Sequence, residues 1–306
     1  MIALKVIKNL LILLFILAIV ITVTGIPVDY NVTIYDGESY SSVGMDELVE
    51  SVKNNFSMFL TGEIFEIEIQ GDSSLGLLFQ AAKRSFTVLI GGTLLALLVG
   101  IPKGIIDSRK TNKSGTFKLL QSLIPLSIPD ILIIAIVQFI AIYLFHNDIA
   151  IFGSEPIPTI GDEGLRNIIY PIISISILPA AYISRIVATE VEDSFTKPYI
   201  LAARGKGCSK YYIISHHMKK NIFYAILSGF PTVIGIMFSS LIIIERLFVY
   251  RGIGFYLIYF YTSGTLQPYE AGLAFTLFVV ALAVIYYFVF IFLNTLKEII
   301  LFENDY

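Results

Sequence analysis

Charged side chains and chemically specialised residues are scarce in this sequence. Only 15% of its 306 residues are charged and 56% are hydrophobic, with a mean hydropathy of +0.80. Soluble domains carry about 25% charged residues, so the composition excludes an ordinary soluble protein and indicates an integral membrane protein. The single cysteine, Cys208, excludes a disulfide framework. The three histidines, His146, His216 and His217, lack the spacing of a metal site.

Sequence motifs for catalysis and nucleotide binding are also missing. The chain has no P-loop for ATP and no H-E-x-x-H sequence. His216 and His217 lie in a polar stretch, and no apolar segment carries a spaced pair of aspartates, which disfavours an intramembrane enzyme. No nucleic-acid-binding motif accompanies the basic residues, and membrane sidedness explains their distribution. We therefore expect no catalytic residue, no metal site and no bound cofactor on this chain.

Six apolar runs approach or exceed the roughly 20 residues that a membrane-spanning helix needs. They cover residues 9–26, 86–106, 119–145, 168–187, 222–244 and 271–293. No A-x-A cleavage site precedes Pro27, so we expect the first run to be retained as a helix rather than removed as a signal peptide. The aromatic stretch 247–269 is broken by Arg251, Gly252 and Gly254. Its uninterrupted run is too short to span, so it is expected to be interfacial or re-entrant.

Residues 27–84 form the one sizeable polar region, with ten acidic residues against three basic ones. Alternation around Asp36-Gly37 predicts a β-hairpin. Apolar residues at i, i+4 spacing predict a helix over residues 46–60. Phe65, Ile67 and Ile69 alternate with polar residues and predict a strand. These signals describe a small α+β module, too small to bury much core by itself.

The distribution of charge predicts the sidedness of the loops. With a cytoplasmic N-terminus, the basic segments 107–118 and 190–221 and the C-terminal tail all face the cytoplasm, while 27–84 and 146–167 lie outside. The predicted fold is an all-α polytopic protein of the bacterial cell membrane, with six transmembrane helices, both termini cytoplasmic and an extracytoplasmic α+β insertion. Its parts are a first helix (1–26), the insertion (27–84), a five-helix core (85–295) and a tail (296–306).

Polar residues inside the apolar runs are candidates for a translocation path. An aspartate in a span is costly, by about 2.5–3.5 kcal/mol at its centre. Asp130 and Gln138 are therefore expected to line a path; alternatively, Asp130 sits in a kinked turn and is satisfied by a neighbouring helix. Ser127 and Glu245 are the other candidates. Glu245 could instead pair with one of two nearby arginines and hold an outer gate.

The segment 190–221 is the longest basic interruption of the apolar sequence. It reads as two short amphipathic helices, 197–205 and 209–219, joined at Gly207, where a glycine permits a sharp turn. Its Ala202-Ala203-x-x-x-Gly207 spacing resembles the cytoplasmic coupling motif of ABC-importer permeases. Residues 180–221 as a whole are similar to the dipeptide/oligopeptide/nickel permease family. The matching positions are Arg185, Tyr199, Ala202, Ala203, Arg204, Lys206, Gly207, His217 and Asn221.

Other segments agree with this resemblance. Gly100-Ile101-Pro102-x-Gly104 is similar to the end of the family's second span, and Ser127-Ile128-Pro129 to its third-span Ser-x-Pro. Glu245-x-x-Phe248 followed by Gly252-Ile253-Gly254 is similar to a third family segment. An outer module after the first span is typical of the first of the family's two permease subunits. Two departures are Leu201, where the family has an acid, and Arg251, where it has a proline.

The resemblance implies a permease subunit that forms half of a pore in an ATP-driven importer of oligopeptides or dipeptides. Implied partners are a second permease subunit, two cytoplasmic ATPase subunits that carry the ATP, and an extracytoplasmic solute-binding protein. The coupling residues would be Ala202, Ala203, Arg204, Lys206 and Gly207. Nickel or a metal chelate is the alternative cargo, and a transport-inactive membrane sensor is the alternative role.

Overall fold

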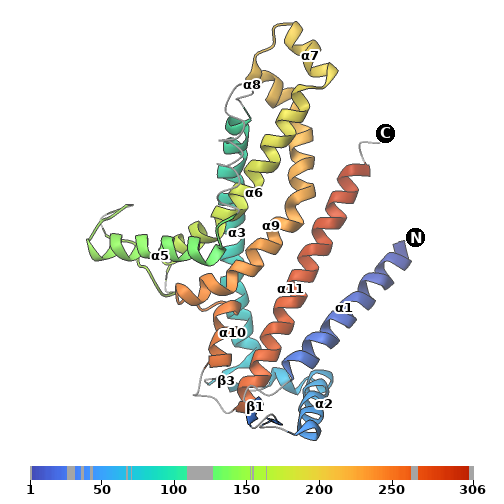
Figure 1. Cartoon of the computed structure of the whole chain (residues 1–306), viewed down its shortest axis with the longest axis vertical. Coiled ribbons are helices and arrows are strands. Elements are labelled where there is room, and N and C mark those ends of the chain that lie inside the picture. Colours follow the sequence, from blue (N-terminus) through green and yellow to red (C-terminus); the bar gives the residue numbers. More distant parts are fainter. Residues whose placement is uncertain are drawn as a thin grey trace. The chain divides into compact units, whose positions relative to one another are not determined.

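The computed structural model describes residues 2–25, 32–35, 38–41, 44–66, 68–69, 71–108, 127–151, 153, 155–162, 164–262 and 268–302. Within these residues the chain is mostly helical (Figure 1). It divides into two compact units, which are described separately below. The first comprises Met1–Ser85 and Arg251–Val289, and the second comprises Phe86–Tyr250 and Phe290–Tyr306.

The first unit contains the N-terminal helix and the polar region that follows it. Helix α1 (Ile2–Thr24) has an apolar surface, and α2 (Met45–Thr61) ends at Gly62, whose φ of +84° makes a left-handed cap. Ser51 of α2 donates a hydrogen bond of 2.8 Å to the carbonyl of Gly25, which ties α2 to the end of α1. Two small antiparallel pairs flank α2: β1 (Val32–Tyr35) with β2 (Glu38–Ser41), and β3 (Glu68–Ile69) with β4 (Asp72–Ser73).

Two C-terminal helices complete the first unit. Helix α10 (Ile253–Thr262) is only 10 residues long, and α11 (Pro268–Phe302) continues into the second unit. Aromatic rings join them: the centroids of Tyr256 and Phe260 lie 5.5 and 5.2 Å from that of Phe278. Ser85, in helix α3 (Ser74–Asp107), accepts a 2.8 Å hydrogen bond from the backbone N–H of Ile253 and so satisfies the start of α10.

The second unit is built on α3, α6 (Ile169–Phe195) and α9 (Lys219–Leu247), and α6 and α9 are in extensive contact. Glycines let α3 approach α6 closely. A Cβ atom at Gly100 would lie 2.8 Å from the carbonyl oxygen of Ala180, and one at Gly104 would lie 2.5 Å from that of Ser184. The Gly-x-x-x-Gly spacing of α3 therefore serves backbone-to-backbone packing, as small residues do between membrane helices.

Helix α5 (Asp130–His146) also belongs to the second unit and contacts α6 and α9. Figure 1 shows it running across the direction of these two helices. Its 17 residues measure about 26 Å at 1.5 Å per residue, which is less than the ~30 Å hydrocarbon core of a bilayer.

Five described helices are long and apolar enough to cross a membrane, where the sequence predicted six. They contain Ile7–Thr24, Ser74–Asp107, Ile169–Phe195, Lys210–Leu247 and Glu270–Ile299. The sixth run, 119–145, is not confirmed: its first part lies outside the described residues, and α5 accounts for the rest. The short α10 agrees with the expectation that 247–269 is too short to span.

The polar region 27–84 differs in part from its prediction. Strands β1 and β2 pair around Asp36-Gly37 as the hairpin signal predicted, although these two residues lie outside the described ones, and α2 confirms the helix. The strand at 65–69 shrinks to the two residues of β3, because Glu63–Phe65 forms a 3₁₀ turn, η1. Helix α3 begins at Ser74, twelve residues before the predicted start of the second span. The basic residues of 109–118 lie outside the described residues.

Candidate functional site

The short helix α7 (Pro198–Gly205) stands between α6 and α9 and presents one face outward. Its start has Pro198 in the first turn, where the missing N–H costs no hydrogen bond. Ile200 is fully buried and Ala203 is 7% exposed, and they form the inner face, where α7 contacts α6 and the segment before α9. Tyr199, Leu201, Ala202, Arg204 and Lys206 are exposed.

Gly207 makes the turn that ends this helix. Its φ is +82°, in the left-handed region that favours glycine. The backbone N–H of Gly207 donates to the carbonyl of Arg204 at 3.0 Å, and that of Cys208 donates to the carbonyl of Ala203 at 3.2 Å. These bonds satisfy carbonyls that the end of a helix leaves open. The sharp turn expected at Gly207 is therefore present.

The second arm of this segment differs from the separate helix that the sequence predicted. Ser209 caps it by accepting a 3.3 Å hydrogen bond from the backbone N–H of Tyr212. The arm then runs without a break through α8 (Lys210–Tyr212) and a π-helical stretch, η2 (Ile213–Met218), into α9. Because of this continuity, the turn at Gly207 links α7 directly to a membrane-spanning helical run, Lys210–Leu247.

A hydrogen bond braces α7 against the start of α9. The side-chain amide of Asn221 donates to the hydroxyl of Tyr199 at 3.1 Å. Within the same region the ammonium of Lys210 lies 4.9 Å from the ring centroid of Phe195 at the end of α6, a cation–π contact. Side chains therefore connect α7 to the start of α9, and α8 to the end of α6.

Charged residues at the ends of α3 and α6 form short local networks. Lys103 pairs with Asp107 at 2.5 Å, and Asp107 also accepts a 3.4 Å hydrogen bond from Ser184 of α6. On α6, Glu190 lies 3.7 Å from the ammonium of Lys197 and accepts a hydrogen bond from Ser194 at 3.1 Å. These contacts are partly exposed, so each contributes little stability alone.

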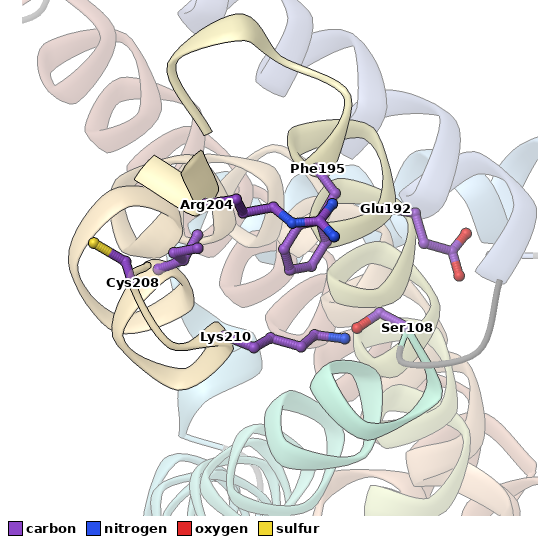
Figure 2. A pocket seen from close by; sticks show the side chains of 7 residues that line it. Ser108, Glu192, Phe195, Arg204, Cys208 and Lys210 are labelled. Atoms are coloured by element: carbon purple, nitrogen blue, oxygen red, sulfur yellow. The ribbon is translucent and has the colours of Figure 1, made fainter. Parts of the chain in front are cut away.

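A cavity of about 310 Å³ lies beneath this segment (Figure 2). Arg204 of α7, Cys208 and Lys210 line it from one side, and Glu192 and Phe195 of α6 from another. Ser108, just past the end of α3, and Ile213 also line it, and Figure 2 shows the ammonium end of Lys210 directed toward Ser108. Two cations of the segment, Arg204 and Lys210, thus line this cavity, and Arg204 is also exposed, as Leu201 and Ala202 are.

The polar residues predicted for a translocation path have local partners in this structure. The carboxylate of Asp130 accepts hydrogen bonds from its neighbour's backbone N–H at 2.9 Å and from the hydroxyl of Ser240 on α9 at 3.0 Å. Ser240 thus gives Asp130 a partner on a neighbouring helix. Glu245 is fully buried on α9, and Ser127 is exposed.

Gln138 holds the end of α9. Its amide donates a 2.7 Å hydrogen bond to the carbonyl of Leu247, the last residue of the helix. The next carbonyl, that of Phe248, accepts a hydrogen bond from the backbone N–H of Gly161 at 3.0 Å. The backbone N–H of Tyr250 donates to the carbonyl of Glu245 at 2.9 Å. The chain turns here through Val249, whose φ is +51°. Gln138 therefore satisfies a helix terminus in this structure.

A comparison with protein families identifies the chain's relatives. Residues 118–300 match the family described as binding-protein-dependent transport system inner membrane component. This match covers more than half of the chain and includes α7, the turn at Gly207 and α9. The chain belongs to this family. The result agrees with the resemblance found in the 180–221 segment.

Individual relatives carry two different transport names. A Brucella abortus (strain 2308) protein named for a peptide transport system permease is 25% identical over 183 residues, which are 57% of this chain and 57% of the relative. A nickel import system permease protein, NikB, of Staphylococcus aureus (strain bovine RF122 / ET3-1) is 26% identical over 205 residues, 67% of this chain and 58% of the relative. The alignments thus span less than two thirds of the length of these relatives.

Among solved structures, the chain is similar to a chain of the inward-facing MetNI methionine ABC transporter. The similarity covers 74% of this chain and 97% of that chain at 15% identity, with a TM-score of 0.49.

Two structural features give physical reasons for residues that the permease family pattern contains. Tyr199 and Asn221, which the pattern places 22 residues apart, meet in one hydrogen bond. Gly100 and Gly104 lie so close to α6 that a Cβ atom at either position would clash with a backbone carbonyl of that helix. Sequence reasoning noted all four residues but gave no contact for them. The Tyr199–Asn221 contact could have been expected, since the turn at Gly207 lies between the two and folds one arm back on the other.

Proposed function

We propose that this chain is a permease subunit of an ATP-driven importer and couples to a cytoplasmic ATPase through the 190–221 segment. The observation that carries the proposal is the exposed face of α7. A helix of 8 residues outside the spans presents Leu201 and Ala202, apolar side chains that no described neighbour covers, beside the cation Arg204. A surface of this kind suits a groove on a partner protein.

The attachment of α7 explains how a partner's movement would reach the membrane. Ile200 and Ala203 pack α7 inward, and the Tyr199–Asn221 hydrogen bond ties it to α9. The turn at Gly207 is short and leaves few residues to absorb motion. A partner that shifts α7 would therefore shift α6 and α9 together, and this would bias the pore between outward-facing and inward-facing states.

The remaining components of the transporter are part of the same proposal. A second permease subunit would complete the pore, two ATPase subunits would bind and hydrolyse the ATP, and a solute-binding protein would deliver the cargo. On this chain Arg204 and Lys206 would supplement docking of the ATPase electrostatically. The segment would then face the cytoplasm, with both termini on the same side, as the distribution of basic residues indicates.

The proposed cargo is an oligopeptide or dipeptide, supported by the Brucella abortus relative's name. Nickel or a metal chelate is the alternative, supported by the Staphylococcus aureus relative's name. A strain lacking this chain should lose uptake of labelled peptides and retain growth in nickel-limited medium. The opposite pattern would assign nickel or a chelate, and unchanged uptake of both would favour a transport-inactive sensor.

Substitution of Gly207 tests the coupling function itself. A Cβ atom added at Gly207 or at Gly205 would meet no other atom within 4 Å, but only Gly207 has a positive φ. A side chain in the left-handed region costs about 1–2 kcal/mol, and more for a branched one. Gly207→Val should therefore reduce uptake and ATPase co-purification, while Gly205→Ala leaves both unchanged. Normal uptake by Gly207→Val, with the protein at normal abundance, would contradict the proposal.

A further inference from the structure

An apolar groove of about 730 Å³ lies between the end of α3 and the start of α9. Ile101 and Ile105, one turn apart on α3, form one wall, and Ile222, Phe223 and Ile226 of α9 form the other. Phe223 is 51% exposed. The groove is separate from the outward face of α7, so docking of a partner on α7 does not account for it.

The mouth of the groove is positively charged. Lys219 and Lys220 line it, both are exposed, and neither forms an ion pair with a described residue. None of the described residues that line the groove is acidic. Asp107 on α3 and Glu190 on α6, two of the acids described above, are already paired with other lysines. The groove therefore complements a molecule with negative charge at one end and apolar groups along its length.

The dimensions of the groove match a lipid in one leaflet. Ile226 lies seven residues beyond Lys219, or about 10 Å along the helix axis, and one leaflet supplies about 15 Å of hydrocarbon depth. A phosphate held at the two lysines would therefore place an acyl chain beside Ile222 and Ile226. Lysines at the edge of a membrane span lie at the level of the lipid headgroups.

We propose that this groove binds an anionic phospholipid, with its phosphate at Lys219 and Lys220 and an acyl chain between α3 and α9. Basic sites between membrane helices bind anionic headgroups in this way. A free phosphate would leave the apolar walls uncovered, and a helix of another subunit would leave two adjacent lysines without countercharge. The proposal requires only that α3 and α9 lie in a membrane, so it stands or falls independently of the coupling function.

The absence of tryptophan from this chain provides a direct assay. Phe223→Trp places the only tryptophan in the groove, and the full chain is reconstituted in phosphatidylcholine vesicles. Fluorescence quenching is then measured as brominated phosphatidylglycerol or brominated phosphatidylcholine replaces the host lipid. The matched reporter is Phe288→Trp on α11, which is 60% exposed and far from the groove in sequence. The charge variant is Lys219→Gln with Lys220→Gln, and Lys53→Gln on α2 is its control.

The groove should select phosphatidylglycerol over phosphatidylcholine. One lysine near an anionic lipid contributes about fivefold in affinity, so the preference should be roughly 5-fold to 25-fold. It should vanish in the Lys219→Gln/Lys220→Gln variant, remain in Lys53→Gln, and be absent at the Phe288→Trp reporter. Equal quenching by both lipids would overturn the proposal, because the groove would then hold only bulk lipid. Absence of quenching by either lipid would overturn it too, because protein would then cover the groove.

Discussion

Close packing of α3 on α6 predicts that the smallest enlargement at Gly104 destabilises the protein. In Gly104→Ala the new Cβ atom would lie 2.5 Å from the carbonyl oxygen of Ser184 and 2.6 Å from the Cβ atom of Val187. Ordinary contacts begin at 3.4 Å, so the overlap is about 1 Å. Both obstructing atoms are backbone or next to it, so no flexible side chain can swing away. The two helices must separate instead.

The expected magnitude follows from two opposing effects. Overpacking of a well-packed core costs about 1–3 kcal/mol. Replacement of glycine by alanine inside a helix stabilises by about 0.5–1 kcal/mol when space is available. Gly272 of α11 offers that second case alone, since a Cβ there meets no atom within 4 Å. The helix gain is common to both variants, so Gly104→Ala and Gly272→Ala should differ by the overpacking cost, about 1–3 kcal/mol in free energy of unfolding.

Thermal unfolding in detergent, followed by helical circular dichroism, measures this difference. Gly104→Ala should melt several degrees below the unsubstituted protein, and Gly272→Ala at or above it. If Gly104→Ala melts as high as Gly272→Ala, then α3 and α6 do not pack backbone to backbone. The assignment of the Gly-x-x-x-Gly spacing to helix packing would then be refuted.

Four further substitutions test three individual hydrogen bonds. Gln138→Leu should lower the melting temperature, because a carbonyl in the last turn of α9 loses its donor at a cost of about 1–3 kcal/mol. Ser85→Ala should cost about 1 kcal/mol, since the start of α10 loses its side-chain acceptor, and the same melting assay checks it. Tyr199→Phe and Asn221→Ala should each reduce uptake, while the double variant should be no worse than the more affected single variant. Additive losses in uptake would contradict the brace between these two residues.

Much of the helical architecture could be predicted from the sequence because long apolar runs leave few alternatives in a membrane. Five of the six predicted runs appear as helices of sufficient length. The ends were less predictable. Helix α3 starts at Ser74 because polar residues of the region before the span continue the same helix. Hydropathy marks where a helix enters lipid and carries no signal for where the helix itself begins.

The candidate site was partly predictable for a similar reason. The glycine at position 207 predicted the turn, since a positive φ favours that residue type. The sequence did not reveal that the second arm would run into α9 through a π-helical stretch, because no residue there breaks the helix. The partners of Asp130 and Gln138 come from α9, more than 100 residues away in the chain. Pairing over such distances leaves no local pattern in a single sequence.

Site-directed crosslinking gives the most direct test of the coupling function. Cys208 is the only cysteine, so Cys208→Ser provides a background without reactive thiols. Ala202→Cys then places one thiol on the outward face of α7, and Leu165→Cys places one at an 87% exposed position in the 146–167 loop. With the complex isolated from membranes, a thiol-reactive crosslinker should join the chain to an ATPase subunit from Ala202→Cys and not from Leu165→Cys. Absence of this adduct at Ala202→Cys, in a complex that retains the ATPase, would contradict the account.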